Sequence, residues 1–269
     1  MRLPAALLVL STAHAFAPRL PVYDRPTTRI SMAASAKPTL YDMPVSNNGA
    51  RVRMLLYYKG VEDRVDVVPP TELGGLTSDA YRALNPQGKM PLLVESDGTA
   101  IPESDTIVRH LRDRFGKDGP SFAPADLAAR TRADMICRHH DLYLGPVQGA
   151  MYKAVPPFAA FSSRAEALAE ISKQCGVLED MVPEGAAYIA GNEVTLADVT
   201  VFPTVVFLLH MLPKFGVDEG AILGPKLSKW WARMCAEEAP AQRVRDEVLG
   251  GLAPWDGEIT VSSTDPPPP

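Results

Sequence analysis

The sequence predicts two compact domains, the first built from helices around a small sheet and the second entirely helical. Its 269 residues exceed one average domain but are few for three. Residues 39–115 alternate short apolar runs with helical periodicity, whereas the chain beyond residue 126 shows helical patterns alone. We therefore divide the chain into a presequence over residues 1–36, an α/β domain over 37–119, a helical domain over 124–256 and a disordered tail over 257–269.

Composition excludes several classes of function. Hydrophobic residues make up 46% of the chain and charged residues 22%, as in a soluble globular protein. Because the net charge is -5, no broad positive surface is available for nucleic acid, and no basic cluster predicts membrane binding. The three cysteines form no C-x-x-C pair, and His139-His140 lack partners at metal spacing. We expect neither a dithiol centre nor a metal site.

The first 36 residues have the composition of a targeting sequence. The apolar stretch at residues 4–10 precedes small residues, as in a signal peptide, and is too short to span a bilayer. Residues 19–37 are basic and rich in Ser and Thr, which is typical of a transit peptide. The Ala-His-Ala-Phe-Ala-Pro run resembles the signal-to-transit junction of plastid presequences in algae with secondary plastids. We expect plastid import, with secretion or a cytosolic product starting at Met32 as alternatives.

A strand, a helix and a second strand open the α/β domain. Residues 39–41 form a short apolar run that reads as the first strand. A turn-rich stretch follows, and apolar residues at helical spacing then predict a helix over residues 51–59 that ends at Gly60. Residues 65–67 alternate as a second strand should, and residues 69–83 form a long connection with one short helix.

A hairpin and a helix close this domain. Residues 85–88 form a turn, after which residues 90–95 and 100–102 are expected as paired strands. The Ser-Asp-Gly-Thr sequence at residues 96–99 supplies the hairpin turn between them. Residues 104–115 then follow as a helix with one apolar face.

The turn and strand residues of the hairpin region carry one specific motif. It runs Asn85-Pro86-x-Gly88-x-x-Pro91-Leu92-Leu93, followed by Glu103-Ser104-x-x-Ile107. This motif resembles the N-terminal domain of glutathione transferases. The resemblance implies a thioredoxin-like domain of the order βαβαββα, followed by an all-α C-terminal domain. It also implies that Pro91 follows a cis peptide bond, and that Met90 pairs through its backbone with the cysteinyl residue of glutathione like an added strand.

The start of the last helix in this domain carries a further part of the implied glutathione site. The resemblance assigns Glu103 and Ser104 to the γ-glutamyl group, because amides at a helix N-terminus favour an anion and the acid takes the ammonium. Lys89 stands where it could approach a carboxylate of the ligand. The simpler alternative is that Ser104 only caps the helix, and the two roles are compatible.

The residue that activates the thiol is expected just before the first helix. In serine-type glutathione transferases a serine lies six residues before the valine of an Arg-Val pair, and Ser46 stands at this distance from Arg51-Val52. A hydroxyl at this junction donates to the glutathione sulfur and, with the helix N-terminus, favours the thiolate, which is the nucleophile. The alternative is that Ser46 serves as a helix cap alone.

Two other types of transferase fit less well. The catalytic tyrosine of tyrosine-type enzymes aligns with Asp42, and the neighbouring Tyr41 points to the opposite face of the strand. Cysteine-type relatives need a cysteine near Ser46, and residues 1–136 contain none. We therefore expect conjugation and not thiol exchange.

The remaining chain predicts helices. A long helix is expected over residues 126–144, and Met135, His139 and Tyr143 lie on one stripe of it. This stripe is expected to line the electrophile pocket or to form interdomain core. The Thr-Leu-Ala-Asp sequence at residues 195–198 resembles the buried capping box in the helical domain of these transferases, whose role there is in folding.

Together these features predict a glutathione transferase that activates the glutathione thiol as thiolate for attack on a hydrophobic alkyl or aryl electrophile, as in detoxification. Glutathione is the expected cosubstrate, with no metal, and isomerisation or peroxide reduction are close variants. The alternative is a non-catalytic carrier or scaffold of the same fold. We expect a homodimer without a membrane span. One departure concerns residues 69–72, Pro-Pro-Thr-Glu, which replace the basic contacts usual after the second strand.

Overall fold

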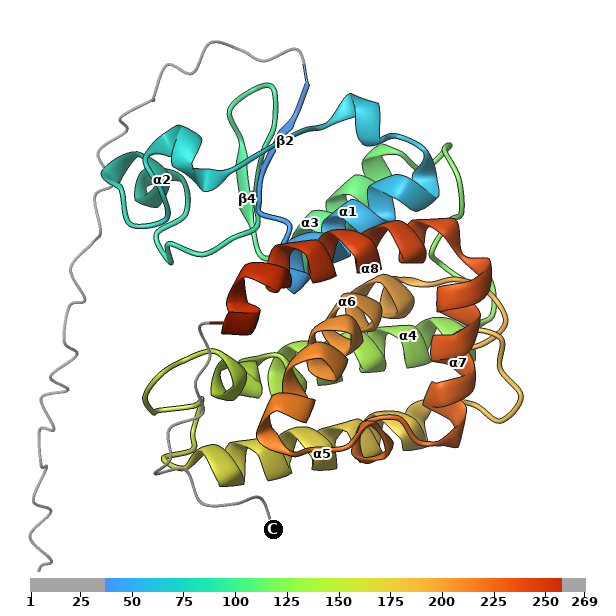
Figure 1. Cartoon of the computed structure of the whole chain (residues 1–269). Coiled ribbons are helices and arrows are strands. Elements are labelled where there is room, and N and C mark those ends of the chain that lie inside the picture. Colours follow the sequence, from blue (N-terminus) through green and yellow to red (C-terminus); the bar gives the residue numbers. More distant parts are fainter. Residues whose placement is uncertain (1–36, 258–269) are drawn as a thin grey trace, which may run out of the picture. The chain divides into compact units, whose positions relative to one another are not determined.

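The described part of the chain begins with an α/β domain (Figure 1). The computed structural model describes residues 37–257, so the expected presequence and nearly all of the expected tail lie outside the described residues. In chain order the first domain comprises β1 (Thr39–Tyr41), α1 (Asn47–Lys59), β2 (Asp66–Val68), α2 (Asp79–Leu84), β3 (Leu92–Val94), β4 (Ala100–Pro102) and α3 (Ser104–Arg114). This is the predicted order, with β2 one residue later and β3 shorter than expected, and the βαβαββα fold class is confirmed.

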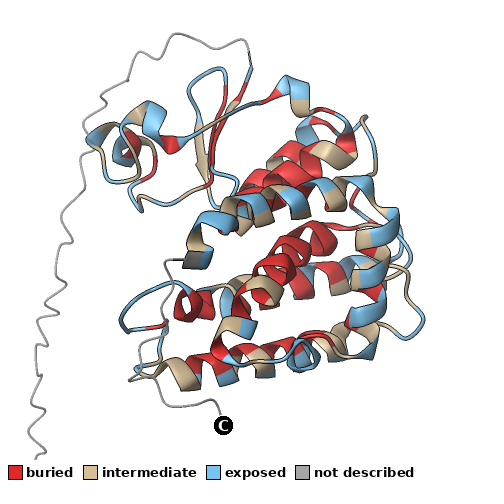
Figure 2. Cartoon of the chain, viewed as in Figure 1, coloured by how far each residue is buried: buried red, intermediate tan, exposed pale blue. Residues whose placement is uncertain are grey.

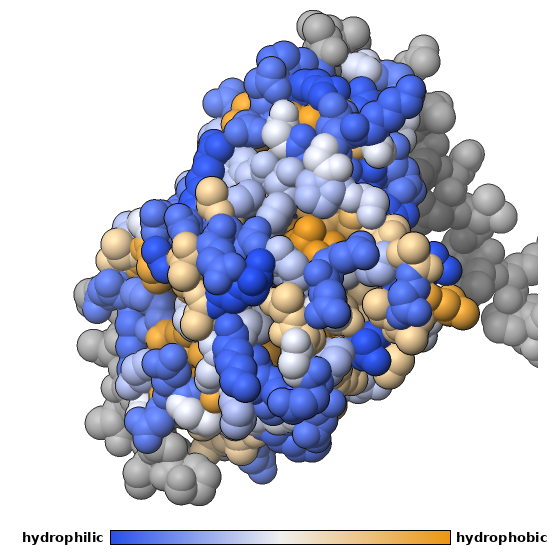
Figure 3. All heavy atoms as spheres, turned by 90° about the vertical axis from the view of Figure 1, so that its right-hand side faces the viewer, coloured by the Kyte–Doolittle hydropathy of each residue, from blue (hydrophilic) through white to orange (hydrophobic). Residues whose placement is uncertain are grey.

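The second domain consists of helices. Its α-helices are α4 (Leu127–His139), α5 (Arg164–Met181), α6 (Leu196–Met211), α7 (Pro225–Glu237) and α8 (Ala239–Leu252). Shorter helical turns are η3 (His140–Leu144), η4 (Pro146–Met151), η5 (Leu212–Phe215), η6 (Glu219–Ala221) and η7 (Ala253–Gly257), besides η1 (Glu62–Arg64) and η2 (Pro70–Leu73) in the first domain. Helix α7 lies at the right of Figure 1, and that side of the molecule is mostly hydrophilic with small apolar patches (Figure 3).

The strands of the described chain form one sheet in the order β2-β1-β3-β4. Strand β1 is parallel to β2 and antiparallel to β3, and β3 is antiparallel to β4. Leu40 and Leu93 join the large core that includes α1 and α3, whereas Tyr41 and Leu92 cluster with Tyr81 of α2. Successive side chains of a strand point to opposite faces, so helices cover both faces of the sheet.

Helix α1 lies between the sheet and the helical domain. It begins at Asn47, four residues before the expected start, because Ser46 caps it by accepting a hydrogen bond from the Gly49 N–H (3.0 Å). It ends before Gly60, whose φ of 62° is left-handed, as predicted. Residues 49–56 are all buried, because α6 and α8 pack on the side that faces away from the sheet.

Helix α6 lies at the centre of the helical domain (Figure 2). Its start is the predicted capping box, in which Asp198 accepts from the Thr195 N–H (2.8 Å) and Thr195 Oγ1 accepts from the Ala197 N–H (3.2 Å). Asp198 also accepts from the indole N–H of Trp230 (2.9 Å). The chain from residue 196 to 215 is long and apolar enough to cross a membrane, but most of it is buried among the other helices.

The long helix expected over residues 126–144 is shorter in the structure. Helix α4 ends at His139, and the chain continues as the π-helical turn η3. Pro146 has no N–H to continue the α-helical pattern, and the Gly145 N–H reaches back five residues to the His140 carbonyl (2.7 Å). Within this turn Asp141 reaches α1 and His140 reaches α6.

Candidate functional site

The register of the sheet brings the three predicted parts of the site to one end. The last residue of β1 lies opposite the first residue of β3, which lies opposite the last residue of β4. The loop to Ser46, the Met90-Pro91 pair and the Glu103-Ser104 pair therefore all leave the sheet at the same end. Residues far apart in the sequence are thus brought to one end of the sheet, as the predicted site requires.

Ser46 caps α1 and still has a hydroxyl proton to donate. Its Oγ accepts from the Gly49 N–H, and no group among the described residues accepts the hydroxyl proton. The residue is partly exposed, and the first turn of α1 has no acidic residue to balance the positive end of the helix dipole. An anion held at Ser46 is therefore stabilised by both the hydroxyl and the helix.

The loop after β1 is held by the buried side chain of Arg53. This guanidinium donates to the Asp42 carboxylate, to the Met43 carbonyl (3.2 Å) and to the Pro44 carbonyl (3.0 Å). Its Nε also donates to Glu247 of α8 (2.9 Å). A single residue of α1 thus fixes the loop and ties it to the helical domain.

The backbone before Pro91 is fixed by two side chains. The Met90–Pro91 peptide bond is cis, as the resemblance implies. The carbonyl of Lys89 accepts from the Tyr81 hydroxyl (2.8 Å) and from Asn85 Nδ2 (2.7 Å). In a trans peptide the N–H points away from the carbonyl, so the Met90 N–H points away from these two donors. The Lys89 side chain is exposed.

Helix α3 begins without a side-chain cap. Its N-cap residue is Glu103 and Ser104 is its first helical residue, so the alternative that Ser104 caps this helix is wrong. Glu103 has a φ of 70°, a conformation that costs a residue with a Cβ about 1–3 kcal/mol. Since no described side chain caps this end, the first amides of α3 are open to an anionic group.

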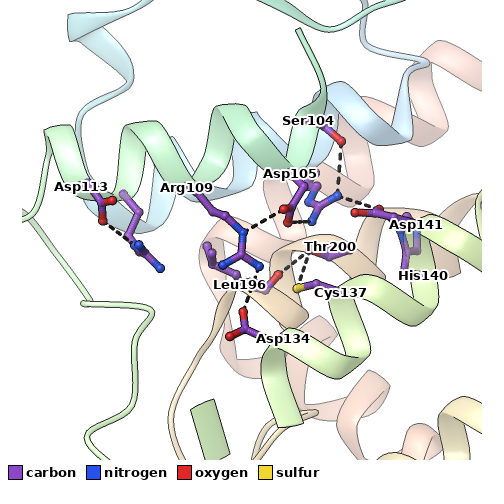
Figure 4. A network of polar contacts seen from close by, with 12 residues as sticks. Ser104, Asp105, Arg109, Asp113, Asp134, Cys137, His140, Asp141, Leu196 and Thr200 are labelled. Carbon is purple, nitrogen blue, oxygen red and sulfur yellow. Dashed lines mark hydrogen bonds and ion pairs between the residues drawn. The ribbon is translucent and has the colours of Figure 1, made fainter. Parts of the chain in front are cut away.

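The buried side chain of Arg51 connects the start of α3 to the helical domain. Its guanidinium donates to Ser104 Oγ (3.3 Å), to the Asp105 carboxylate and to Asp141 (2.9 Å). Figure 4 shows Ser104, Asp105 and Asp141, which come from two different domains, close to one another. Burial opposes the charge of Asp141, but its contacts with His140 and Arg51 outweigh this and lower its pKa. The carboxylates of Asp105 and Asp141 hold Arg51, and Arg51 holds Ser104.

The residues predicted to line the electrophile pocket lie in different environments. His139 is buried, with Nε2 3.1 Å from the Gln174 carbonyl of α5, whereas Met135 and Tyr143 are 53% and 54% exposed. The His139 and Tyr143 rings are in contact, with 5.7 Å between their centroids. Among the described residues, no hydrogen bond or ring contact joins this stripe to the Ser46 loop. Its role in substrate binding stays a prediction.

Other elements of the helical domain border the Ser46 loop. Asn47 Nδ2 donates to Gln148 of η4 and to Thr204 of α6 (3.3 Å). Val45 lies directly against Gly251 of α8, where a Cβ would come within 2.6 Å of the Val45 nitrogen. This close approach requires glycine. The end of α8 therefore lies next to the predicted thiol site.

A groove of about 790 Å³ runs along the other flank of the same loop. Strand β2, helix α1 and helix α8 line it, and Tyr57, Arg243 and Glu247 are among its residues. None of the residues predicted to contact glutathione lines this groove. Its arginines are already paired with carboxylates, as Arg243 is with Glu62 (3.0 Å), so the groove is separate from the candidate site in place and in chemistry.

The buried cysteines are unsuited to act as nucleophiles. Burial raises the pKa of Cys137 to about 11 and that of Cys175 to about 12, so both thiols stay protonated near neutral pH. Within residues 37–257, no group of three or more His, Cys, Asp and Glu side chains is arranged to hold a metal ion.

The sequence predictions do not include the residues that position the site. Arg51 and Arg53 lie in an apolar helical run, and an arginine buried in such a run requires charged partners. Their positions in the sequence therefore indicated buried ion pairs. Nothing local identifies Asp141 as a partner, because it lies 90 positions from Arg51. Tyr81 and Asn85 lie close to the motif in the sequence. Their two hydrogen bonds to the Lys89 carbonyl nevertheless depend on how α2 folds.

Known proteins of similar sequence and structure share this arrangement of domains. A profile of the glutathione S-transferase N-terminal domain matches residues 40–121, and one of the C-terminal domain matches residues 147–238. Glutathione S-transferase 3 of Zea mays is 26% identical over 204 residues, which cover 74% of this chain and 90% of that relative.

Two solved structures show the same architecture. A glutathione S-transferase domain-containing protein from Marinobacter aquaeolei VT8 is 27% identical with a TM-score of 0.61, covering 74% of this chain and 98% of that one. A Tau class glutathione S-transferase from mango, Mangifera indica, shares the fold at 24% identity with a TM-score of 0.65, covering 82% and 98%. With both domain profiles matched in order on this fold, the chain belongs to the glutathione S-transferase family.

Proposed function

We propose that this protein is an enzyme that activates the thiol of glutathione as thiolate for attack on a hydrophobic electrophile. The observation that carries the proposal is the convergence of Ser46, Met90 and Ser104 at one end of the sheet. There the Ser46 hydroxyl proton is available, the Met90 N–H points away from the core donors, and the first amides of α3 are open. These groups suit the sulfur, the cysteinyl backbone and the γ-glutamyl carboxylate of glutathione, in that order.

The proposed reaction needs a nucleophile and no redox partner. The glutathione thiol loses its proton to solvent, and the Ser46 hydroxyl and the positive end of α1 stabilise the thiolate. The sulfur then forms a bond to an electrophilic carbon, which expels a leaving group or passes its electron pair to an adjacent unsaturated group. Removal of reactive electrophiles in this way would make detoxification the role of the enzyme.

Binding to immobilised glutathione, followed by conjugation of an aryl halide, tests this proposal. We expect retention on glutathione together with turnover. Retention without turnover would favour the non-catalytic carrier or scaffold. Absence of retention would contradict the glutathione site itself, and residues 69–72, which lack basic side chains, make this measurement the critical one.

We also propose that the protein forms a homodimer. Leu127, Met135 and Leu142 recur at helical spacing along α4 and η3 and are 66%, 53% and 49% exposed. Large apolar side chains exposed together are typical of an interface. Light scattering should give about twice the 29.1 kDa mass of the chain, and Leu127→Glu should shift the protein towards the monomer. A monomeric wild-type protein at micromolar concentration would contradict this proposal.

We further propose that residues 1–36 direct the protein to a plastid, which their signal-like and transit-like composition supports. A fluorescent protein fused behind this segment should enter the plastids of an alga with secondary plastids. A fusion that starts at Met32 should stay in the cytosol. Secretion of the full-length fusion would contradict plastid import and favour the plain signal peptide.

A further inference from the structure

His140 lies beside Asp141 where the helical domain meets α1 (Figure 4), and both of its ring nitrogens are engaged. The residue belongs to the turn η3 and is 2% exposed. Its Nδ1 lies 2.8 Å from Asp141 Oδ1, and its Nε2 lies 2.7 Å from Thr204 Oγ1. A buried imidazole with two polar partners is part of a polar network and not of the apolar core.

The direction of each hydrogen bond follows from the groups at the ends of this network. Asp141 Oδ1 already accepts from Arg51 Nη1 (2.9 Å), and a carboxylate can only accept, so His140 Nδ1 carries a proton. Burial lowers the pKa of His140, so the ring is neutral and Nε2 accepts from the Thr204 hydroxyl. Thr204 Oγ1 in turn accepts from Asn47 Nδ2 (3.3 Å).

The two ends of this series of hydrogen bonds reach the two halves of the proposed glutathione site. Asn47 directly follows Ser46, which is proposed to hold the sulfur. Arg51 donates to Ser104, which is proposed to hold the γ-glutamyl group. Asn47 and Arg51 lie four residues apart on α1, so they face the same side of this helix, towards His140.

We propose that His140 is a positioning residue that holds, from the helical domain, both the sulfur end and the γ-glutamyl end of the site. This inference rests on the proposed function, because it assigns His140 a role in that site. The hydrogen bonds from Nε2 through Thr204 to Asn47, the Nε2 arm, end at the Ser46 loop and govern ionisation of the glutathione thiol. The contacts from Nδ1 through Asp141 and Arg51, the Nδ1 arm, end at Ser104 and govern affinity for glutathione.

Two conservative variants separate the arms. In His140→Asn the amide nitrogen takes the place of Nδ1 and keeps the bond to Asp141, but the side chain is too short to reach Thr204. In His140→Gln the amide oxygen takes the place of Nε2 and accepts from Thr204, while the bond to Asp141 is lost. We expect the Asn variant to keep its affinity for glutathione and lose about tenfold in kcat, and the Gln variant to keep kcat and bind about tenfold more weakly.

Calorimetry, conjugation kinetics and the ultraviolet absorbance of bound thiolate measure these effects, each corrected for the folded fraction. The thiol pKa of bound glutathione should rise in His140→Asn and stay unchanged in His140→Gln, whereas His140→Phe should show both losses. A purely structural role would lower the Tm of the three variants and leave affinity, kcat and thiol pKa per folded molecule unchanged. That result would overturn the proposal, as would equal losses of affinity and kcat in the Asn and Gln variants.

Thr204→Val tests the same arm from its other end if the His140 variants fail to fold. The matched control is Thr200→Val, one turn earlier on α6. The Thr200 hydroxyl is equally buried, donates to the Leu196 carbonyl (2.6 Å) and lies 3.5 Å from the Cys137 sulfur, so it does not belong to the hydrogen bonds that pass through His140. Thr204→Val should lower kcat about tenfold and raise the thiol pKa, and Thr200→Val should change neither. Equal effects of the two variants would overturn the proposal. Failure of the wild-type protein to bind glutathione would instead refute the proposed function.

Discussion

The N-termini of α1 and α6 are capped by similar side chains but are left in different states. At α6, Thr195 and Asp198 cap each other, and the Asp198 carboxylate is 0% exposed and accepts from two main-chain amides, a hydroxyl and an indole N–H. At α1, Ser46 makes one capping bond, to Gly49, and no acid lies in the first turn. The first cap is complete and the second is not.

A hydroxyl side chain at a helix N-terminus can therefore serve folding, as at α6, or ligand binding, as proposed for α1. A complete, buried cap has no donor left, so its removal should affect stability. An incomplete, accessible cap keeps a donor and the helix dipole for an anion, so its removal should affect function.

The largest effect should come from Asp198→Ala. Four buried donor groups lose their acceptor at once, so the free energy of unfolding should fall by about 3–5 kcal/mol. Urea unfolding measures this loss, and Asp198→Asn, which keeps one acceptor oxygen, should lose less. The folded fraction should retain its activity. A variant that unfolds normally yet loses turnover would place Asp198 in catalysis and remove the contrast.

Ser46→Ala should lower the conjugation rate about 100-fold, equivalent to about 2.7 kcal/mol, because one preorganised donor to the sulfur is lost. Affinity for glutathione should change little, and stability should fall by about 1 kcal/mol through the lost cap. Ser163→Ala is the matched control, since Ser163 caps α5 through the Glu166 N–H (3.4 Å) and should show the stability loss alone. Unchanged turnover in Ser46→Ala would refute the catalytic assignment.

A smaller effect is expected at the start of α3. Ser104→Ala and Glu103→Gln should each weaken glutathione binding by about 1–2 kcal/mol, because each removes one polar contact to the γ-glutamyl group. The rate at saturating glutathione should be retained. Calorimetry measures the affinity, with Ser78→Ala, at the cap of α2, as the control. If affinity is unchanged in both variants, the γ-glutamyl group does not bind at this helix.

The smallest effect concerns pH. Burial lowers the pKa of His139 and of His140, so below about pH 6.5 the unfolded chain binds protons that the folded chain does not. The stability that the neutral rings contribute at neutral pH should therefore be lost progressively as the pH falls from about 7 to about 5.5. Urea unfolding at these two pH values, with His139→Phe as a variant of reduced slope, measures it. A flat profile would contradict neutral buried rings.

Features that depend on neighbouring residues could be predicted from the sequence. The glycine stop at Gly60 and the capping box at residues 195–198 each need only a few adjacent positions, and the structure confirms both. The cis bond before Pro91 followed from the resemblance of one motif. Local chemistry decides such features whatever the rest of the chain does.

Features that depend on distant packing could not be predicted. The spacing of apolar residues in α1 predicted one buried side of this helix, but α6 and α8 also bury the side that faces away from the sheet. The regular spacing of the α4 stripe gave no sign of η3, the turn in which Asp141 contacts α1 and His140 contacts α6. The partner of Arg51 in the helical domain is a long-range contact that no local pattern encodes.

The sharing of α1 between the sheet and the helical domain limits how this protein can be recombined. A chimera that joined its α/β domain to the helical domain of a relative would leave Arg51 paired with Asp105 but without Asp141, and Arg53 paired with Asp42 but without Glu247. A buried guanidinium that loses one of its two carboxylate partners is less well compensated for its removal from water, so each loss destabilises the folded state. Exchange of helical domains within the family should therefore cost least stability where the incoming helical domain carries matching carboxylates, which makes these two arginines a compatibility test for any hybrid.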